Sequence, residues 1–310
     1  MGTGVGFGKV ILFNEHFVVY GLPAIASAIG AKTTALVERR AGSGVELKDE
    51  RPETKGYKNQ KLNQQKESLD RMLKFMNIDA EHNAFTITLG GDLIAASGVG
   101  ASAASCAAIA RAFSQELHLN CSDEKINEIA YEGEKGYHGT PSGIDNTAAT
   151  FGGLIWYKRE GSSQLMERMR LRKPVEIVMG NTGMVSDTKV VVSGVKERKE
   201  REPEKYGRIF KDAEQLVRDA RKQIEQFNLH KIGTYMNENH KLLQEIGVSC
   251  NELDTLVNLA CDSGALGAKM TGTGKGGYMV ALTPGRELQR RVTEEIERKG
   301  FQALPTTIGI

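Results

Sequence analysis

The sequence predicts two domains that each combine β-strands with α-helices, and three observations lead to this expectation. The chain has 310 residues, more than a single hydrophobic core ordinarily holds. Short β-branched and aromatic runs dominate residues 5–39. From Val175 onward, one strand is followed mainly by apolar residues at helical spacing. We place the boundary at residue 172, which gives domains 1–172 and 173–310, with a linker at 161–174.

The first domain is expected to begin with strands and to continue with helices. The runs V-I-L-F, F-V-V-Y and T-A-L-V-E within 5–39 predict strands, and so does the alternating segment 85–89. Helical spacing appears near the end of 55–77. A helix is expected at about 103–117, and a second one begins after the N-cap Ser122 and ends at about Glu134 or Gly136. Strand character returns at 149–157.

In the second domain a strand at 175–179 is followed by several helices. An apolar stripe with spacings of three and four runs from Ile209 to Phe227 and predicts a long helix. Helices are also expected at 230–246, 251–262 and 286–299, with strands after the loop 271–277 and at the end of the chain. The charged run 196–205 alternates Lys and Arg with Glu, which is typical of a solvated helix face.

Composition excludes several classes of function. The formal net charge is +2 and charged residues make up 26%, so no nucleic-acid or membrane surface is indicated. No apolar run approaches the roughly 18 residues of a membrane span, and no secretory signal pattern is present, so we expect a cytoplasmic protein. The four cysteines form no C-x-x-C pair, which fits a reducing compartment and argues against a zinc or redox centre.

Three glycine-rich runs stand out, at 4–9, 97–104 and 271–277. No G-x-x-x-x-G-K-[ST] motif exists, which excludes a Walker-type phosphate loop. The third run matches G-x-G-x-x-G, but a strand follows it where a dinucleotide-binding fold requires a helix. The second run leads directly into an apolar helix. Unpaired N–H groups and the helix dipole make such a helix start an anion site, although a simple helix-start turn has the same sequence pattern.

Two carboxylates, Glu134 and Asp145, lie between the second and third runs. A phosphoryl-transfer site commonly holds Mg²⁺ with one or two protein carboxylates and uses another to orient the acceptor hydroxyl. Taken alone, each carboxylate would be a surface or loop residue. Their combination with Lys9, Ser102 and two glycine-rich loops favours phosphoryl transfer.

Together these segments resemble the GHMP kinase superfamily, and within it the mevalonate kinases, most closely a protist-like form. The resemblance rests on G-K-V-I-L-F-N-E-H-F-V-V-Y-G at 8–21, S-G-V-G-A-S-A-A at 97–104, G-E-K-G-Y-H-G-T-P-S-G-I-D-N at 133–146 and G-A-L-G-A-K-M-T-G-T-G-K-G-G at 264–277. It implies an α+β fold of two domains. The N-terminal nucleotide domain would contain a left-handed β-α-β unit, and the C-terminal domain would be ferredoxin-like.

The resemblance also implies roles for individual residues. Asp145 corresponds to the catalytic aspartate and Lys9 to the lysine that pairs with it, while Ser102 and Glu134 correspond to the Mg²⁺ ligands. The loop that cradles the ATP phosphates corresponds to Gly98, Val99, Gly100, Ala101, Ser102, Ala103 and Ala104. Substrate contacts correspond to Glu15, His16, Thr188 (within S-D-T-K at 186–189), Gly272 and Gly274. The implied reaction is phosphorylation of mevalonate by ATP with Mg²⁺, and a homodimer is consistent with the resemblance.

Three alternatives stay open at this point. The chain could be another GHMP kinase, whose acceptor is phosphomevalonate, a sugar or an amino acid. It could be a non-catalytic sensor with the same fold. The third alternative is an enzyme of this fold that catalyses a dehydrating decarboxylation. The sequence also departs from the family pattern in three places. Asn14 and Lys275 replace glycines, and Ala101 replaces a serine. Asn tolerates left-handed backbone, so the turn at Asn14 is expected to survive. We expect Lys275 either to contact phosphate or to point to solvent, and His138 to be structural.

Overall fold

The computed structural model describes residues 1–96, 98–160, 163–184, 186 and 188–310, which form two compact units. Unit 1 consists of Met1–Lys9 and Ala28–Gly152, and unit 2 of Val10–Ser27 and Gly153–Ile310. Strands β1 (Gly2–Phe13) and β2 (Ala24–Arg40) therefore contribute residues to both units. The expected division at residue 172 differs from this one, and no expectation anticipated the segment Val10–Ser27 in the second unit.

A β-hairpin explains where the chain divides. Strand β5 (Leu154–Glu160) pairs with β6 (Ser163–Met169), so much of the expected linker 161–174 is a strand; residues 161–162 lie outside the described residues. Strand β5 also pairs with Ala24–Ser27 at the start of β2. These ladders bind the hairpin to unit 2, and the division consequently falls between Gly152 and Gly153.

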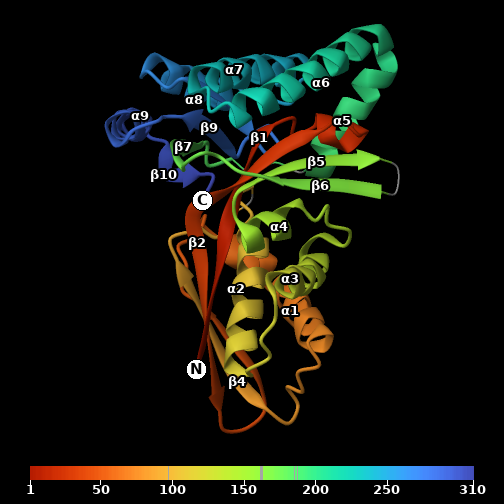
Figure 1. Cartoon of the computed structure of the whole chain (residues 1–310), viewed down its shortest axis with the longest axis vertical. Coiled ribbons are helices and arrows are strands. Elements are labelled where there is room, and N and C mark those ends of the chain that lie inside the picture. Colours follow the sequence, from red (N-terminus) through yellow and green to blue (C-terminus); the bar gives the residue numbers. More distant parts are fainter. Residues whose placement is uncertain (97, 161–162, 185, 187) are drawn as a thin grey trace. The chain divides into compact units, whose positions relative to one another are not determined.

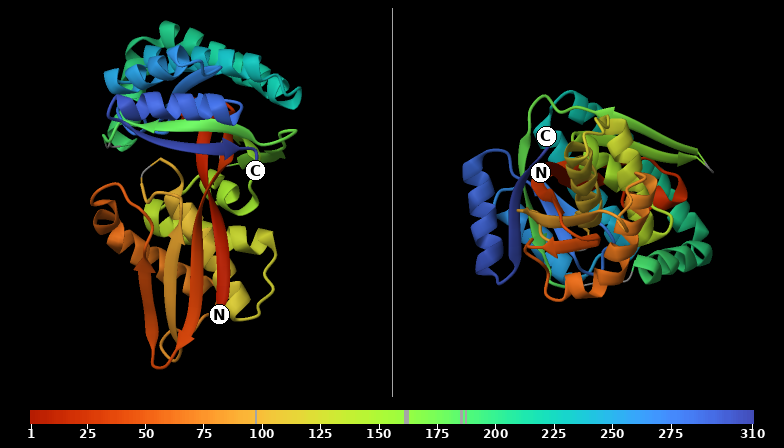
Figure 2. Two further views of the ribbon diagram at one scale, coloured as in Figure 1. Left: turned by 90° about the vertical axis from the view of Figure 1, so that its left-hand side faces the viewer. Right: turned by 90° about the horizontal axis from the view of Figure 1, so that it is seen from below.

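In unit 1 a group of helices packs along a set of strands (Figure 2). Strand β4 (Ala84–Gly91) pairs in parallel with β3 (Gly44–Asp49) and antiparallel with β2, which also pairs with β1. The helices are α1 (Tyr57–Phe75), α2 (Ala101–Glu116), α3 (Asp123–His138) and α4 (Ile144–Phe151). Phe85, Ile87 and Leu89 of β4 are fully buried against α1, α2 and α3. The alternation that predicted a strand at 85–89 therefore marks its core face.

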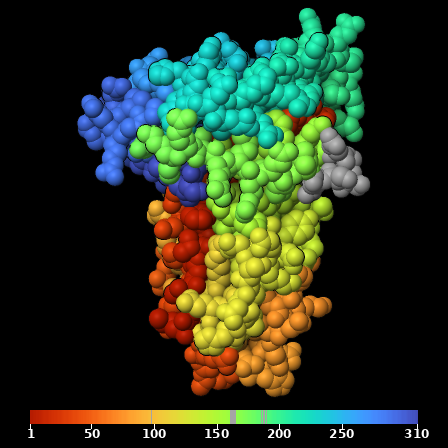
Figure 3. All heavy atoms as spheres, in the orientation of Figure 1, coloured from red at the N-terminus to blue at the C-terminus, as the bar shows by residue number. Residues whose placement is uncertain are grey.

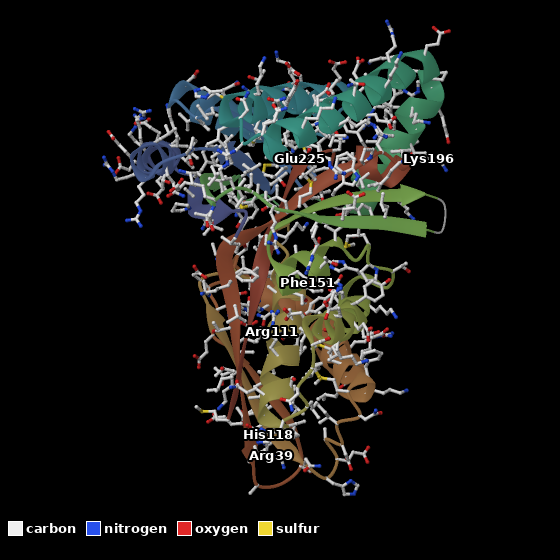
Figure 4. The ribbon with its side chains drawn as sticks, in the orientation of Figure 1. Arg39, Arg111, His118, Phe151, Lys196 and Glu225 are labelled. Atoms are coloured by element: carbon white, nitrogen blue, oxygen red, sulfur yellow. The ribbon has the colours of Figure 1, made fainter. Side chains whose placement is uncertain are left out.

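The first glycine-rich run forms a packing surface. A Cβ atom at Gly4 would lie 2.0 Å from the carbonyl oxygen of Ala108, and one at Gly6 would lie 2.1 Å from that of Ala104. Strand β1 therefore approaches the backbone of the alanine-rich helix α2 more closely than any side chain would allow. Arg111, labelled in Figure 4, strengthens this junction because its guanidinium donates to the carbonyl oxygens of Val5 and Thr150, each at 2.7 Å.

Unit 2 contains an antiparallel sheet in the order β10 (Gln302–Ile308), β7 (Val175–Asn181), β9 (Tyr278–Leu282) and β8 (Gly267–Thr271). Its helices are α5 (Thr188–Arg201), α6 (Pro203–Glu225), α7 (Leu229–Glu245), α8 (Asn251–Asp262) and α9 (Arg286–Arg298). Helices α6 and α7 lie side by side in Figure 1, and their atoms form part of the visible surface of unit 2 in Figure 3, where the green atoms of β5 and β6 are visible too. No helix among the described residues is long and apolar enough to cross a membrane.

The structure corrects several expected elements. The run F-V-V-Y is a 3-10 helix, η1 (Phe17–Tyr20), because Phe17 is buried in the core of unit 2 while Val19 is 55% exposed. The segment 149–157 is the end of α4 followed by β5, and the charged run 196–205 is broken into α5 and α6 at Glu202. Strands β3, β6 and β8 and helix α4 were not expected; they are short and carry weak periodicity. The remaining predicted helices are confirmed.

Candidate active site

Lys9 and Asp145 form an ion pair within unit 1. Strand β1 carries Lys9, whose backbone N–H donates to the carbonyl oxygen of Val99 at 2.8 Å. Asp145 lies in the first turn of α4, which follows Gly143 in the left-handed conformation. The distance between Lys9 Nζ and Asp145 Oδ1 is 3.0 Å, and the side chain of Lys9 is buried whereas that of Asp145 is 31% exposed. The predicted catalytic pair is therefore assembled, with the carboxylate on the open side.

The second glycine-rich run passes directly over Lys9. Gly98 and Gly100 have φ values of 91° and 71°, and a Cβ atom at Gly100 would lie 3.1 Å from Lys9 Cβ. Helix α2 begins at Ala101, and no described side chain caps its N-terminus. The N–H groups of Ala101–Ala103 can consequently be offered to an anion, whereas that of Ala104 already donates to the carbonyl oxygen of Gly100 at 2.9 Å. Ser97, which the sequence also placed in this run, lies outside the described residues.

Glu134 near the end of α3 is a buried carboxylate. It is only 1% exposed, Ser102 hydrogen-bonds to it, and its Oε1 has no hydrogen-bond partner in the described part of the chain. Burial, followed by the charge of Asp145, raises the pKa of Glu134 to about 8. A buried carboxylate oxygen without a donor beside a hydroxyl fits the hard oxygen ligands that Mg²⁺ requires. The predicted ligands Ser102 and Glu134 thus lie together.

An open hollow of about 260 Å³ borders this region. Its lining includes Glu134, Asp145 and His138, together with the loop between α3 and α4. The Nε2 atom of His138 lies 3.8 Å from Glu134 Oε2, and burial lowers the pKa of this histidine. His138 was expected to be structural, yet its ring borders the same hollow as the two carboxylates.

In unit 2, Glu15 forms an ion pair with Lys269, a residue that sequence reasoning missed. The Lys269 side chain is fully buried, and its Nζ donates to Glu15 Oε1 and, at 2.6 Å, to the carbonyl oxygen of Met270. A charged lysine is rarely buried unless it is paired. The available signal was a single lysine within the apolar stretch G-A-K-M-T, which the structure shows as strand β8.

His16, Thr188 and the third glycine-rich run also meet in unit 2. The His16 Nε2 atom lies 2.6 Å from the carbonyl oxygen of Thr273, so the neutral ring carries its proton on Nε2. Burial lowers the pKa of His16, which favours this neutral form. Thr188 and Thr273 share a hydrogen bond of 2.9 Å between their hydroxyls. Thr273 is therefore a second residue that sequence reasoning missed, although it lies inside a predicted motif.

Local backbone geometry explains why the third run contains glycines. Gly272 and Gly274 have φ values of 81° and 79°, and a Cβ atom at Gly274 would lie 2.1 Å from the carbonyl oxygen of Val248. Lys275 is also left-handed, at φ 54°, and its Nζ donates to the carbonyl oxygen of Ser249 at 2.9 Å. The two expectations for Lys275 named phosphate and solvent; its amine instead binds the backbone of unit 2.

Asn14 adopts the left-handed conformation that was expected for it, with φ 71°. Its side chain, fully buried, donates to the carbonyl oxygens of Pro23 and Ala213 at 2.9 and 3.1 Å and accepts from Asn239 Nδ2 at 3.1 Å. Asparagine therefore supplies both the turn and hydrogen bonds to α6 and α7 that glycine cannot make.

One α+β unit contains a helix N-terminus open to anions, a Lys–Asp pair and a buried carboxylate oxygen without a described partner, which are the parts that a phosphoryl-transfer site requires. Comparison with family models agrees with this chemistry. The model of the GHMP kinases N terminal domain matches residues 66–153, and that of the GHMP kinases C terminal matches residues 220–302. The chain belongs to the GHMP kinases, which use ATP as phosphoryl donor.

Several relatives that match nearly the whole chain carry the name mevalonate kinase. The mevalonate kinase of Pyrococcus horikoshii is 35% identical over 94% of this chain and 91% of its own length. The mevalonate kinase of Pyrococcus abyssi is 34% identical over 97% of this chain and 93% of its own length. Among solved structures, L. major mevalonate kinase in complex with R-mevalonate is 36% identical, with a TM-score of 0.95 over 99% of this chain and 96% of the other.

Proposed function

We propose that this chain transfers the γ-phosphoryl group of ATP to the primary hydroxyl of mevalonate and produces 5-phosphomevalonate. The observation that carries the proposed chemistry is the Lys9–Asp145 pair beneath the loop that opens α2. The choice of acceptor is supported by relatives named mevalonate kinase that match nearly the whole chain.

In the proposed reaction the two members of the pair act on the acceptor hydroxyl. Asp145, which is partly exposed, orients this hydroxyl and accepts its proton as the bond to phosphorus forms. Lys9 holds the carboxylate at 3.0 Å and stabilises the negative charge that develops on the transferred group. The N–H groups in the first turn of α2 bind the phosphate oxygens and align the donor.

Ser102 and Glu134 are the residues that would hold Mg²⁺. The unpartnered Oε1 of Glu134 and the neighbouring Ser102 hydroxyl supply oxygen ligands of the required kind. When bound, the cation neutralises charge on the phosphates of the nucleotide. Because its pKa is raised to about 8, Glu134 would have to lose its proton in order to serve as a ligand of the cation.

Residues of unit 2 are proposed to recognise mevalonate. Because Nε2 of His16 donates to Thr273, its Nδ1 atom is left as an acceptor suited to a hydroxyl. Thr188 supplies a hydroxyl fixed by Thr273. Glu15 is held by Lys269, so we propose that it acts by fixing the chain beside His16. Gly272 and Gly274 allow the close turns of the third loop.

The test is ADP release with Mg-ATP, measured against mevalonate, phosphomevalonate, galactose and homoserine. We expect the highest kcat/KM with mevalonate. Faster phosphorylation of galactose or homoserine would overturn the proposed acceptor and leave the family unchanged. Absence of ADP release with every acceptor, from a folded protein that binds ATP, would support the non-catalytic sensor instead.

The oligomeric state and the cellular location of the protein stay predictions. A homodimer would be recognised by light scattering coupled to gel filtration, which measures mass independently of shape. A cytoplasmic location would be recognised by fractionation of the cells that produce the protein.

A further inference from the structure

Arg51, which follows strand β3, is a buried arginine for which the proposed reaction has no direct use. It is 6% exposed, and its Nη1 donates to Ser105 Oγ at 2.7 Å, to the carbonyl oxygen of Ala101 at 3.2 Å and to Thr33 Oγ1 at 3.3 Å. Ala101 and Ser105 lie one helical turn apart at the start of α2. One nitrogen of Arg51 therefore binds the first turn of the helix that carries the phosphate loop.

The charge of Arg51 is compensated from the opposite side. Its Nε and Nη2 donate to the two carboxylate oxygens of Asp49 at 2.9 and 2.6 Å. Burial by itself would raise the pKa of Asp49, but the hydrogen bonds from Arg51 lower it. Lys58 Nζ donates to the carbonyl oxygen of Asp49 at 2.8 Å and so supports the same turn. The bidentate geometry fixes the plane of the guanidinium and aims Nη1 at α2.

The first turn of α2 is held from its carbonyl side. Helices commonly fix their first turn with a side chain that occupies the N–H groups, but no described side chain does so in α2. Instead, the carbonyl oxygen of Ala101 accepts from Arg51 and, at 2.8 Å, from Ser105 Oγ. This arrangement orders the turn while its N–H groups stay available to an anion. Ser102, the next residue, is the proposed Mg²⁺ ligand.

We propose that Arg51, set by Asp49, is a positioning residue that aligns the first turn of α2 for the phosphates of ATP. The proposal rests on the proposed function only in taking ATP as the ligand of this loop. Loss of the alignment is expected to weaken ATP binding and phosphoryl transfer while mevalonate binding is retained, because the residues proposed to recognise mevalonate belong to unit 2.

Four variants test the proposal. Arg51→Met removes the contact with α2 and leaves the carboxylate of Asp49 with weaker partners among the described residues, Lys58 Nζ at 3.7 Å and Gln65 Nε2 at 3.4 Å. The variant Asp49→Asn/Arg51→Met removes both charges of the bidentate pair, so it guards against simple unfolding. Ser105→Ala removes one acceptor and preserves the ion pair. Arg71→Met is the matched control, because Arg71 is a half-exposed arginine of α1 whose ion pair with Glu67 lies on the surface.

The readouts are the KM values for ATP and mevalonate, kcat, the melting temperature, and the Kd for a non-hydrolysable ATP analogue by calorimetry. We expect the double variant to raise the KM for ATP and the Kd at least about tenfold, because small misplacements of aligning groups have large effects. Ser105→Ala should show a smaller change in the same direction. The KM for mevalonate and every constant of Arg71→Met should stay within about twofold of the wild type.

A lower melting temperature with unchanged Kd and unchanged KM for ATP in the double variant would overturn the positioning role and leave a purely structural one. An equal rise in both KM values would overturn it as well. If the wild type binds the ATP analogue but does not phosphorylate mevalonate, the proposed acceptor fails, and the calorimetric titrations still decide the role of Arg51.

Discussion

At the scale of single residues, Glu134 and Asp145 show how neighbouring carboxylates acquire different properties. Glu134 is enclosed by α3 and α2, and its pKa is raised to about 8. Asp145 is partly exposed at the start of α4 and is paired with Lys9. Different environments for two carboxylates in one site commonly separate a cation ligand or acid from a base.

Replacing Asp145 by Asn keeps the size of the side chain and removes its charge and basicity. We expect kcat to fall by about 10²–10⁴-fold, the usual contribution of a general base, with little change in the Kd for ATP. Steady-state kinetics and calorimetry on the same preparation measure both quantities. Near-normal turnover by a folded variant would remove Asp145 from the catalytic role.

Glu134→Gln and Ser102→Ala should each increase the Mg²⁺ concentration required for half-maximal rate, and Glu134→Gln should do so more strongly because it removes a charge. In the wild type a proton competes for Glu134, whose pKa is raised to about 8, so this concentration should fall as the pH rises toward 8. Titrations of Mg²⁺ at fixed ATP between about pH 6 and pH 8 check both statements. An unchanged requirement in both variants contradicts the assignment.

At the scale of elements, the pairing of β1 with α2 places Lys9 beneath the phosphate loop. The glycines of β1 let α2 lie against the strand, and the backbone hydrogen bond from Lys9 to Val99 continues the contact into the loop. A glycine pattern that resembles a ligand-binding loop thus serves mainly to set the distance between a strand and a helix.

Gly6→Ala should destabilise unit 1 by several kcal/mol, because the new methyl group would overlap the carbonyl oxygen of Ala104 at 2.1 Å. Gly207→Ala in α6 is the matched control. Nothing lies within 4 Å of a Cβ atom there, so the better helix propensity of alanine should stabilise the protein by about 0.5–1 kcal/mol. Thermal melting followed by circular dichroism distinguishes them, and equal melting temperatures would contradict the packing argument.

The contact between α5 and the third loop gives a further prediction. Thr188 starts α5, and a role as a helix cap alone would predict a loss of about 0.5–2 kcal/mol with modest kinetic change. We expect instead that Thr188→Ala raises the KM for mevalonate while the melting temperature holds, because the Thr188 hydroxyl shares a hydrogen bond with the Thr273 hydroxyl. Thr188→Ser, which keeps the hydroxyl, is the control and should retain a KM near the wild-type value.

At the scale of the whole molecule, the free energy of unfolding depends on pH through His240, a buried histidine of α7. His240 Nε2 contacts Asp254 Oδ1 at 3.1 Å, and its Nδ1 accepts the backbone N–H of Met270 at 3.3 Å. Burial, reinforced by Lys269 and opposed by Asp254, lowers the pKa of His240 to about 4. Protonation would remove the acceptor for Met270, so the native structure favours the neutral ring.

Because the pKa of His240 is lower in the folded than in the unfolded chain, the unfolded state binds more protons between about pH 6.5 and pH 4. Stability should therefore fall as the pH decreases through this window, by on the order of 3 kcal/mol from this residue. Urea unfolding at several pH values measures this fall in the free energy of unfolding. The signal is the fluorescence of Trp156, which is the single tryptophan and belongs to unit 2.

His240→Gln is the comparison for this effect, since an amide can donate to Asp254 and accept from Met270 without titrating. The variant should show a shallower loss of stability between about pH 6.5 and pH 4 than the wild type. Parallel curves for the two proteins would mean that other groups carry the acid sensitivity of unit 2.

The sequence by itself determined the features that depend on near neighbours in the chain. The N-cap at Ser122, the helical stripe of α6 and the helix start after the second glycine-rich run are visible in a few adjacent residues, and the structure confirms them. The motifs were sufficient to identify the family, because each of them lies within a short segment of the chain.

Only the tertiary structure decided which residues are brought together from distant positions. Lys269 and Glu15 are 254 positions apart, and Arg51 and Ser105 are 54 apart, so no local pattern announces either contact. The same reason explains why the boundary expected at residue 172 differs from the division observed between Gly152 and Gly153. The ladder between β5 and the start of β2 joins segments that are far apart in the chain. Short segments specify their own backbone, whereas burial and pairing of charges depend on what the fold places opposite them.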